Sequence, residues 1–307
     1  MKQRDYIEAN RQSWDEAAPV HARQKMADLL AGFATPGYSC LDEIETGILE
    51  RIGVAGKAVA QLCCNNGREL LSVRNMGATR CVGFDISQAF LDQGRQLAAA
   101  GGIDCEFVAG SVYDIPSSYD GQFDLVTVTI GALGWLPDID GFFAVVARLL
   151  KPGGCIFIYE MHPVLVMFEP GEEKNPLDIR YSYFVTEPFR DDSGLDYYGG
   201  ERRPSKPNYW FHHKLSDIIG GCLAHRLVPE HFVEYDVDIS GVHAASAVLP
   251  PVADDLLLVG ERQFVRDLLR REPGELGDVA RVTRRSLDLH DPLLLLVVRE
   301  PHASRVP

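Results

Sequence analysis

The sequence predicts an α/β protein built on a doubly wound sheet, with an aromatic-rich cap inserted after the fifth strand of that sheet. The first observation is the segment Val59–Gly67, VAQLCCNNG, which is followed eighteen residues later by Asp85 at the end of CVGFD. This order of strand, tight loop, helix, strand and acid is typical of a nucleotide-binding βαβ unit. The second is that strand-like and helical segments keep alternating up to Glu160, and the third is that aromatic residues among prolines and glycines follow it.

The core elements are expected in a regular order. Strands are predicted at 58–62, 80–84, 105–109, 123–130 and 155–160, with helices at 68–75, 88–100 and 139–150 between them. Ser87 is a suitable N-cap for the second of these helices. Helical segments at 5–31 and from 39 or 41 to 52 precede the core, so residues 1–56 are expected to be N-terminal helices that could act as a lid. Residues 57–161 are then the cofactor-binding core.

The loop after the first strand indicates which adenosine cofactor would fit. A dinucleotide site needs several glycines, because the backbone must approach a pyrophosphate closely. The stretch from Cys63 to Leu70 contains Gly67 as its single glycine, which disfavours a pyrophosphate. S-adenosylmethionine carries no phosphate, and Asp85 stands where ribose hydroxyls would lie.

Several motifs occur in the order of a known family. Gln61–Gly67 is similar to the glycine-rich first motif of class I S-adenosylmethionine-dependent methyltransferases, with Gln61, Cys63 and Asn65 in place of the usual acid and two glycines. Asp85 matches the ribose-binding acid, and LLKPGG at 149–154 matches the turn before the fifth strand. The chain therefore resembles this family over roughly residues 5 to 160. The resemblance implies these cofactor-binding residues: Gln61, Cys63, Asn65, Gly67, Asp85, Ile86, Ser111, Val112, Ile130 and Gly131.

The same resemblance implies the rest of the fold. We expect a Rossmann-like seven-stranded sheet, with a strand at 231–239 and an antiparallel last strand at 292–299, on the sheet edge. Residues 215–307 would complete the core around an unusual insertion at about 242–290, which contains a predicted helix at 261–271 and has no functional interpretation. In this family an insertion after the fifth strand commonly builds the acceptor pocket, which here would be residues 162–214.

The cap is expected to supply the acceptor walls. Alternating runs at 180–185 and 208–215 could pair as antiparallel strands, and Ser216 could cap a helix that runs to about Arg226. The candidate substrate-binding residues are Tyr6, Trp14, Trp135, Tyr183 and Trp210. Packing within the cap or the lid explains such aromatic residues as well.

Three side chains are candidates for a catalytic base. Glu160 and His162 stand at the carboxyl end of the fifth strand, where open α/β sheets bind their ligands. His212 lies in a predicted strand and could face the cleft. A histidine that hydrogen-bonds the backbone at the Pro163 bend is the alternative for His162. A base is needed only for acceptors that must lose a proton, since a neutral amine can attack unaided.

Composition restricts the partners. A formal charge of -14 opposes binding to nucleic acids, so a small-molecule acceptor is favoured. No apolar run reaches the roughly 20 residues of a membrane span and the N-terminus has no signal-peptide core, so we expect a cytoplasmic protein without a membrane partner. The seven cysteines form no CxxC pair, which favours buried thiols and no metal. A homo-oligomer remains open.

The predicted function is methyl transfer from S-adenosylmethionine to an O or N atom of a small molecule. Transfer to a carbon atom is the alternative within the enzyme class. A protein that binds the cofactor without turnover is a second alternative, which the loss of motif glycines favours. A dinucleotide-dependent oxidoreductase is a third, which the lone Gly67 disfavours.

Overall fold

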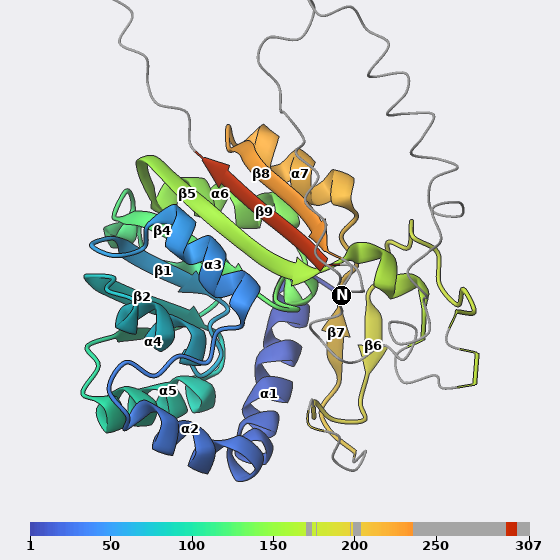
Figure 1. Cartoon of the computed structure of the whole chain (residues 1–307). Coiled ribbons are helices and arrows are strands. Elements are labelled where there is room, and N and C mark those ends of the chain that lie inside the picture. The colour runs from blue at the N-terminus through green and yellow to red at the C-terminus, as the bar shows by residue number, and fades with distance from the viewer. Residues whose placement is uncertain (170–173, 176, 197, 199–203, 236–292, 300–307) are drawn as a thin grey trace, which may run out of the picture.

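A computed structural model describes residues 1–169, 174–175, 177–196, 198, 204–235 and 293–299 (Figure 1). Its strands are β1 Ala58–Leu62, β2 Arg80–Asp85, β3 Glu106–Ala109, β4 Phe123–Thr129, β5 Leu150–Met161, β6 Phe189–Asp191, β7 Asn208–Trp210, β8 Val228–Tyr235 and β9 Leu293–Arg299. The larger sheet has the order β3-β2-β1-β4-β5-β9-β8, and β6 pairs with β7 in a separate hairpin.

The first five strands of the larger sheet run parallel, as the sequence predicts. β9 is antiparallel to both of its neighbours, β5 and β8. The prediction that the last strand forms the sheet edge was wrong, because β8 occupies the edge and β9 lies one strand inside it. Sequence order does not reveal this arrangement, since the strand that comes last in the chain can pair between two earlier strands.

Helices cover the sheet on both faces, as a doubly wound fold requires. They are α1 Gln3–His21, α2 Ala27–Phe33, α3 Glu43–Ile52, α4 Arg68–Asn75, α5 Gln88–Gly101, α6 Ile139–Leu149 and α7 Leu215–Ala224. Phe142 and Phe143 of α6 are fully buried with Ile156 of β5 in one cluster. Leu49 of α3 and Phe157 of β5 are buried in the cluster on the opposite face. Each such side chain stabilises the fold by roughly 1.5–3 kcal/mol through burial.

Local signals placed some helix ends correctly and others wrongly. Ser87 caps α5 as predicted, because its side chain accepts a hydrogen bond from the Phe90 N–H. Ser216 does not cap α7, which begins at Leu215 with Lys214 as N-cap. The single helix expected at 5–31 is interrupted by a π-helical turn at 22–26, three residues after Pro19.

The cap also differs from its prediction. Residues 180–185 form no strand, and the partner of β7 is β6 instead. The Tyr183 carbonyl oxygen lies 2.8 Å from His212 Nε2, so it is not available as the acceptor of a strand ladder. The assignment of residues 162–214 as an acceptor cap stays a prediction. The predicted insertion at 242–290 with its helix, and residues 236–239 of the predicted strand, lie outside the described residues.

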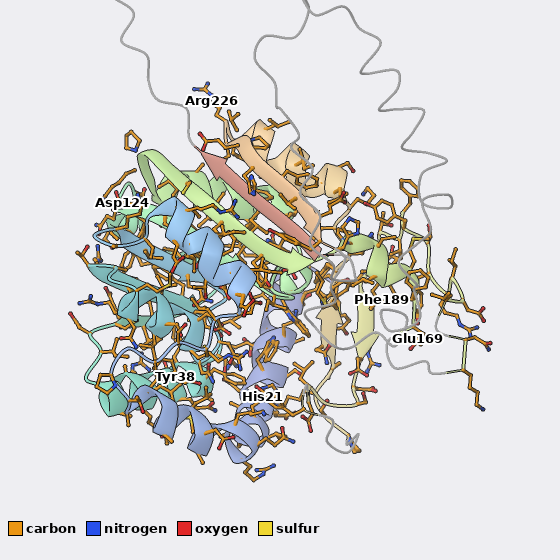
Figure 2. All side chains as sticks on the ribbon, in the orientation of Figure 1. His21, Tyr38, Asp124, Glu169, Phe189 and Arg226 are labelled. Carbon is orange, nitrogen blue, oxygen red and sulfur yellow. The ribbon has the colours of Figure 1, made fainter. Side chains whose placement is uncertain are left out.

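Helix α1 lies between the sheet core and the β6–β7 hairpin (Figure 1). Figure 2 shows His21 near the lower end of this helix and Phe189 on β6. α1 therefore contacts both α5 of the core and β7 of the hairpin. Within the described ranges, no helix has the length and apolar character needed to cross a membrane.

Candidate active site

A cavity of about 860 Å³ lies at the carboxyl ends of β1, β2, β4 and β5, where α1 and the β6–β7 hairpin close over the sheet. Its walls include nine of the ten predicted cofactor residues: Gln61, Cys63, Asn65, Asp85, Ile86, Ser111, Val112, Ile130 and Gly131. Gly67, the tenth, is absent from the wall. The volume is within the range of pockets that enclose small ligands, about 300–1,000 Å³.

The loop after β1 turns sharply despite its lack of glycines. Cys63 and Asn65 both adopt left-handed backbone conformations, with φ of 54° and 52°. Gly67 is also left-handed, and a Cβ atom there would lie 2.4 Å from the Phe107 ring. Gly67 therefore shapes the loop by letting Phe107 pack beneath it, rather than by touching a ligand. A left-handed cysteine carries backbone strain of the kind found at functional sites.

Asp85 is held at the end of β2 by two backbone donors. One carboxylate oxygen accepts from the Asn65 N–H at 2.7 Å, and the other accepts from the Ser87 N–H at 2.8 Å. Removal from water raises the pKa of Asp85 to about 6, although these two hydrogen bonds oppose the shift. The backbone of Ile86 also donates to this carboxylate, which retains acceptor capacity for a further donor such as a ligand hydroxyl.

Gln61 presents an unpaired acceptor at the end of β1. The side chain is 1% exposed, and its amide nitrogen donates to the Thr129 hydroxyl at 3.0 Å. Its amide oxygen is buried and has no partner among the described residues. A buried unpaired acceptor costs free energy unless a ligand satisfies it. Gln61 thus fits an ammonium group, such as that of the methionine part of S-adenosylmethionine, although it lacks the charge of the acid usual at this position.

The turn after β3 contributes Gly110, Ser111 and Val112 to the cavity wall. The Gly110 N–H donates to the Asp85 carbonyl, and Val112 is buried against the core. The Ser111 hydroxyl accepts from the Tyr113 N–H at 3.3 Å. Its own hydrogen is therefore free to donate to a ligand.

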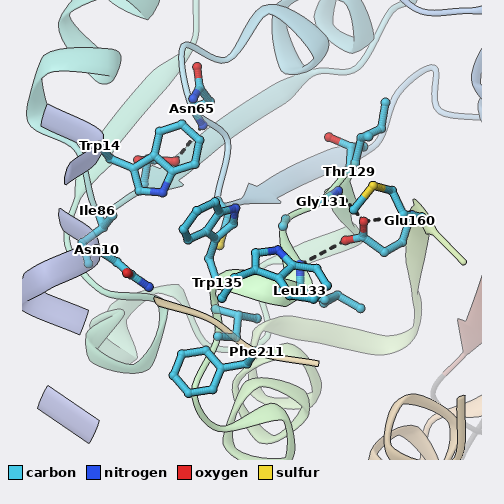
Figure 3. Close-up of a pocket in the computed structure, with 18 of the residues that line it drawn as sticks. Asn10, Trp14, Asn65, Ile86, Thr129, Gly131, Leu133, Trp135, Glu160 and Phe211 are labelled. Atoms are coloured by element: carbon cyan, nitrogen blue, oxygen red, sulfur yellow. Dashed lines mark hydrogen bonds between the residues drawn. The ribbon is translucent and has the colours of Figure 1, made fainter. Parts of the chain in front are cut away.

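Glu160 is a buried carboxylate that organises the loop after β4 (Figure 3). Its oxygens accept from the N–H groups of Gly131, of Leu133 at 3.0 Å and of Met161 at 2.9 Å. Burial raises the pKa of Glu160, and these hydrogen bonds counteract the rise. Both oxygens are thus engaged in fixing the backbone that faces the cavity at Gly131.

The two histidine candidates differ in their free atoms. His162 Nδ1 accepts from the Val164 N–H at 3.1 Å, so Nε2 carries the proton and donates to Glu234 at 2.6 Å. His212 Nε2 lies 2.8 Å from the Tyr183 carbonyl and must donate to it. His212 Nδ1 is then a lone-pair acceptor, and it is buried without a partner in the described part of the chain. Burial lowers the pKa of His212, which keeps the ring neutral.

Aromatic side chains form the wall opposite the sheet. Trp14 of α1 and Trp135 make an edge-to-face contact with ring centroids 5.0 Å apart (Figure 3). Trp210 lies against Gly134, where a Cβ atom would come within 2.1 Å of its indole. All three tryptophans line the cavity, and their role in binding an acceptor stays a prediction.

Two predicted acceptor residues do not line the cavity. Tyr6 packs edge-on against Tyr209 and Phe211, behind the wall. Tyr183 accepts from the Leu215 N–H through its hydroxyl and contacts His212 through its ring. Each supports a wall residue instead of touching the cavity, because the residue it packs on lies between it and the cavity.

Sequence reasoning missed several wall residues. Arg68 directly follows Gly67, and its guanidinium is paired with Glu69 and lies 3.4 Å from the Tyr198 hydroxyl. Asn10 lies on α1 and lines the cavity beside Trp14. The position of Arg68 at the start of the helix was a readable signal, whereas nothing in the sequence distinguishes Asn10. Among the residues that the structure describes, no cluster of three or more potential metal ligands occurs.

Comparison with known proteins identifies the class of the core. Residues 59–154 match a family described as a methyltransferase domain. A 2-phytyl-1,4-naphtoquinone methyltransferase of Synechococcus elongatus is 37% identical over 124 residues, which cover 37% of this chain and 52% of that protein. A ubiquinone biosynthesis O-methyltransferase of Thiobacillus denitrificans is 33% identical over 107 residues, 35% of this chain and 45% of that protein. The chain thus spans about half the length of the curated relatives it matches.

Solved structures show the same fold over most of the chain. A geranyl diphosphate C-methyltransferase of Streptomyces coelicolor aligns with a TM-score of 0.54 at 17% identity, covering 96% of this chain and 98% of that one. An S-adenosylmethionine-dependent methyltransferase of Mesorhizobium loti aligns with a TM-score of 0.52 at 18% identity, covering 83% and 97%. Residues 59–154 thus match a methyltransferase domain, and the chain has the fold of S-adenosylmethionine-dependent methyltransferases.

Proposed function

We propose that this protein transfers a methyl group from S-adenosylmethionine to an O or N atom of a small, largely apolar acceptor. The observation that carries the proposal is a single cavity whose wall includes Asp85 and Gln61 at one part and Trp210 and His212 at another. S-adenosylmethionine, when bound, supplies a methyl group already activated by the positive sulfonium. The protein then has to align the acceptor and exclude water.

The donor half of the cavity supports cofactor binding residue by residue. Asp85 would hold the ribose hydroxyls, and the unpaired Gln61 oxygen would accept from the ammonium group. Ser111 and Val112 would border the adenine, with a hydroxyl donor in place of the acid common in the family. The seven-stranded sheet, with its antiparallel β9, would be the scaffold that carries this cofactor site.

His212 is the residue we assign as general base. Of the three candidates, it alone has an acceptor atom that receives no hydrogen bond from the described residues, because His162 Nδ1 and both Glu160 oxygens already accept from backbone N–H groups. Nδ1 would accept a proton from an acceptor hydroxyl as the oxygen attacks, and the Tyr183 carbonyl would steady the ring through Nε2. Glu160 would act as a positioning residue for the Gly131 loop.

The acceptor class follows from the wall. Trp14, Trp135 and Trp210 offer aromatic faces and edges that favour a planar, apolar molecule. A hydroxyl on that molecule would match His212 Nδ1, which favours O-methylation over methylation of a neutral amine. Transfer to an acidic carbon is the second candidate, since the same base could remove a proton from carbon. A non-catalytic binding protein would have no need for a cavity that joins the donor residues to the tryptophans.

The proposal is tested by binding first and transfer second. We expect S-adenosylmethionine and S-adenosylhomocysteine to bind the wild type in calorimetry, and labelled methyl to pass to a member of a panel of hydroxylated aromatic compounds. His212→Ala should lower turnover by about 10²-fold or more, the usual effect of losing a general base, while S-adenosylhomocysteine binding stays nearly unchanged.

A matched control is His225→Ala, because His225 pairs with Asp140 outside the cavity. Its turnover should equal that of the wild type. Failure of the folded wild type to bind either cofactor form would refute the methyltransferase proposal. Undiminished turnover of His212→Ala would refute the base assignment alone, and NMR of the product distinguishes O-, N- and C-methylation.

A further inference from the structure

We propose that Asn10 is a positioning residue that couples the cofactor site to the acceptor wall through helix α1. The coupling runs from Asp85 through Ser87 and Asp15 to α1, and from Asn10 to the β7 backbone. This inference rests on the proposed function, because it takes Asp85 as a cofactor contact and β7 as part of the acceptor wall.

Asn10 makes two hydrogen bonds to the backbone of Tyr209, which is 199 positions away in the sequence. Its amide nitrogen donates to the Tyr209 carbonyl at 2.9 Å, and its amide oxygen accepts from the Tyr209 N–H at 2.7 Å. The side chain is 3% exposed. A primary amide presents a donor and an acceptor side by side, as a neighbouring strand would, so Asn10 takes the place of a strand partner for β7.

The position of Asn10 within α1 favours this assignment. Asparagine is a weak helix former, and in a helix interior it is usually exposed. Here it is buried in the second turn of a helix whose far side carries charged residues such as Glu8 and Arg11. Asn10 therefore contributes through its bond to Tyr209 rather than through helix stability.

The opposite link of α1 reaches the cofactor site. Asp15, five residues after Asn10, accepts from the Ser87 hydroxyl at 2.7 Å. The Ser87 N–H donates to Asp85 at 2.8 Å, so Asp15 and Asp85 share one serine. Gln93 of α5 adds a second tie by donating to the Ala18 carbonyl at 2.8 Å. A ligand that binds Asp85 would therefore affect Ser87, the residue that anchors α1 through Asp15.

The β7 backbone in turn sets the acceptor wall. Trp210 follows Tyr209 directly and packs on Gly134, and the Phe211 N–H donates to the Gly134 carbonyl at 2.6 Å. Trp14 of α1 meets Trp135, the next residue, from the other side. Since α1 contributes one part of the wall and holds the other through Asn10, ordering of α1 by the cofactor orders both parts together.

The test is hydrogen exchange with S-adenosylhomocysteine as the probe, which needs no acceptor. In the wild type we expect saturating S-adenosylhomocysteine to slow exchange about tenfold or more in peptides covering residues 206–215, as well as around Asp85, because binding stabilises coupled segments. In Asn10→Ala, protection around Asp85 should remain and protection of 206–215 should be lost. S-adenosylhomocysteine affinity should change less than about threefold.

The matched control is Asn75→Ala, which removes another asparagine bond to a backbone carbonyl, that of Tyr38, at 2.8 Å and away from the cavity. It should leave ligand-induced protection of 206–215 as in the wild type. If Asn10→Ala does not fold, Asn10→Asp serves, because it keeps the acceptor for the Tyr209 N–H and loses the donor; its protection should be reduced.

Three results separate the possible failures. No S-adenosylhomocysteine binding to the wild type refutes the proposed function and with it the premise of the coupling. Binding with protection confined to the sheet overturns the coupling alone. Equal protection of 206–215 in the wild type and in Asn10→Ala shows that Asn10 is structural only, and overturns its assignment as a positioning residue.

Discussion

The proposed donor side of the cavity, around Gln61 and Asp85, and the proposed acceptor side, around Trp210, are built in different ways. On that donor side, Gln61 and Asp85 stand at the ends of adjacent parallel strands. Asp85 accepts from Asn65 of the intervening loop, and Gln61 donates to Thr129 at the end of β4, the other neighbour of β1. On the acceptor side, Trp210 packs on Gly134, and Asn10 bonds Tyr209. The first is a local product of strand order, whereas the second exists only when distant segments meet.

This difference separates the two sides chemically as well. Donor residues use backbone donors and charged or amide groups, which suit a polar cofactor. The residues of the proposed acceptor side are mostly aromatic and are positioned by packing, which would suit an apolar molecule. A single packing residue such as Gly134 can therefore change the shape of the proposed acceptor wall although it makes no contact with Asp85.

The largest expected effect is on the donor side. Asp85→Ala removes the acceptor of two backbone N–H groups and of the proposed ribose hydroxyls. Hydrogen bonds to charged groups contribute about 1.5–3 kcal/mol each, so S-adenosylhomocysteine affinity should fall roughly 100-fold or more in calorimetry. Trp210→Ala, on the other side, should leave that affinity within about threefold.

Asp124→Ala is the control for loss of a strand-end carboxylate. Asp124 accepts from the Ala58 N–H and from Lys151, both at 2.8 Å, at the opposite end of the strands. Its removal should lower stability without a comparable loss of affinity. An Asp85→Ala protein that binds as tightly as the wild type would remove Asp85 from the cofactor site.

An intermediate effect is expected on the acceptor side. Gly134→Ala places a Cβ atom 2.1 Å from the Trp210 indole, so the ring or the loop must move. Overpacking of this kind costs about 1–3 kcal/mol in the free energy of unfolding, measurable by urea titration. Turnover should fall with stability, because Trp210 is part of the proposed acceptor wall.

Gly47→Ala provides the comparison, since no heavy atom lies within 4 Å of the added Cβ and Gly47 is in the interior of α3. It should raise the free energy of unfolding by up to about 1 kcal/mol, because alanine is the better helix former. Equal stability of Gly134→Ala and the wild type would contradict the packing of Trp210 on Gly134.

Sequence reasoning could bring the proposed cofactor residues together at one cavity for a physical reason. Strand periodicity places Asp85 at a strand end, and the ends of adjacent parallel strands meet at one edge of the sheet. The methyltransferase class of the core was predicted from the same motifs and is confirmed by the family match at 59–154. The position of β9 could not be predicted, because the pairing partners of an added strand are decided by tertiary contacts.

The acceptor side was predictable only in part. Aromatic density in the cap pointed to Trp210 and Tyr183, and the lid helix pointed to Trp14 and Tyr6. In each pair the tryptophan lines the cavity and the tyrosine packs behind it, a difference that the sequence does not reveal. The roles of Glu160, His162 and His212 depend on which atoms the backbone already occupies. Glu160 accepts from the Leu133 N–H, and His212 contacts the Tyr183 carbonyl. Such hydrogen bonds to the backbone of distant residues cannot be predicted from the periodicity of the sequence. These three roles stay proposals until they are tested.

The smallest expected effect is a pH dependence confined to the donor side. Burial raises the pKa of Asp85 to about 6 from its usual 3.8, so the free protein binds a proton there as the pH falls through 6. Because the proton prefers the folded state, this group stabilises the fold as the pH drops from 7 towards 4.

The affinity for the cofactor should change in the opposite direction, because ribose hydroxyls would donate to the ionised carboxylate. S-adenosylhomocysteine affinity should therefore weaken about tenfold between pH 7 and pH 5, as expected for one protonation with this pKa. Calorimetry at both pH values checks it, and in Asp85→Asn the weaker affinity should not change with pH. An equally steep decline in Asp85→Asn would assign the titration to another group and leave the carboxylate at the end of β2 without a role in pH dependence.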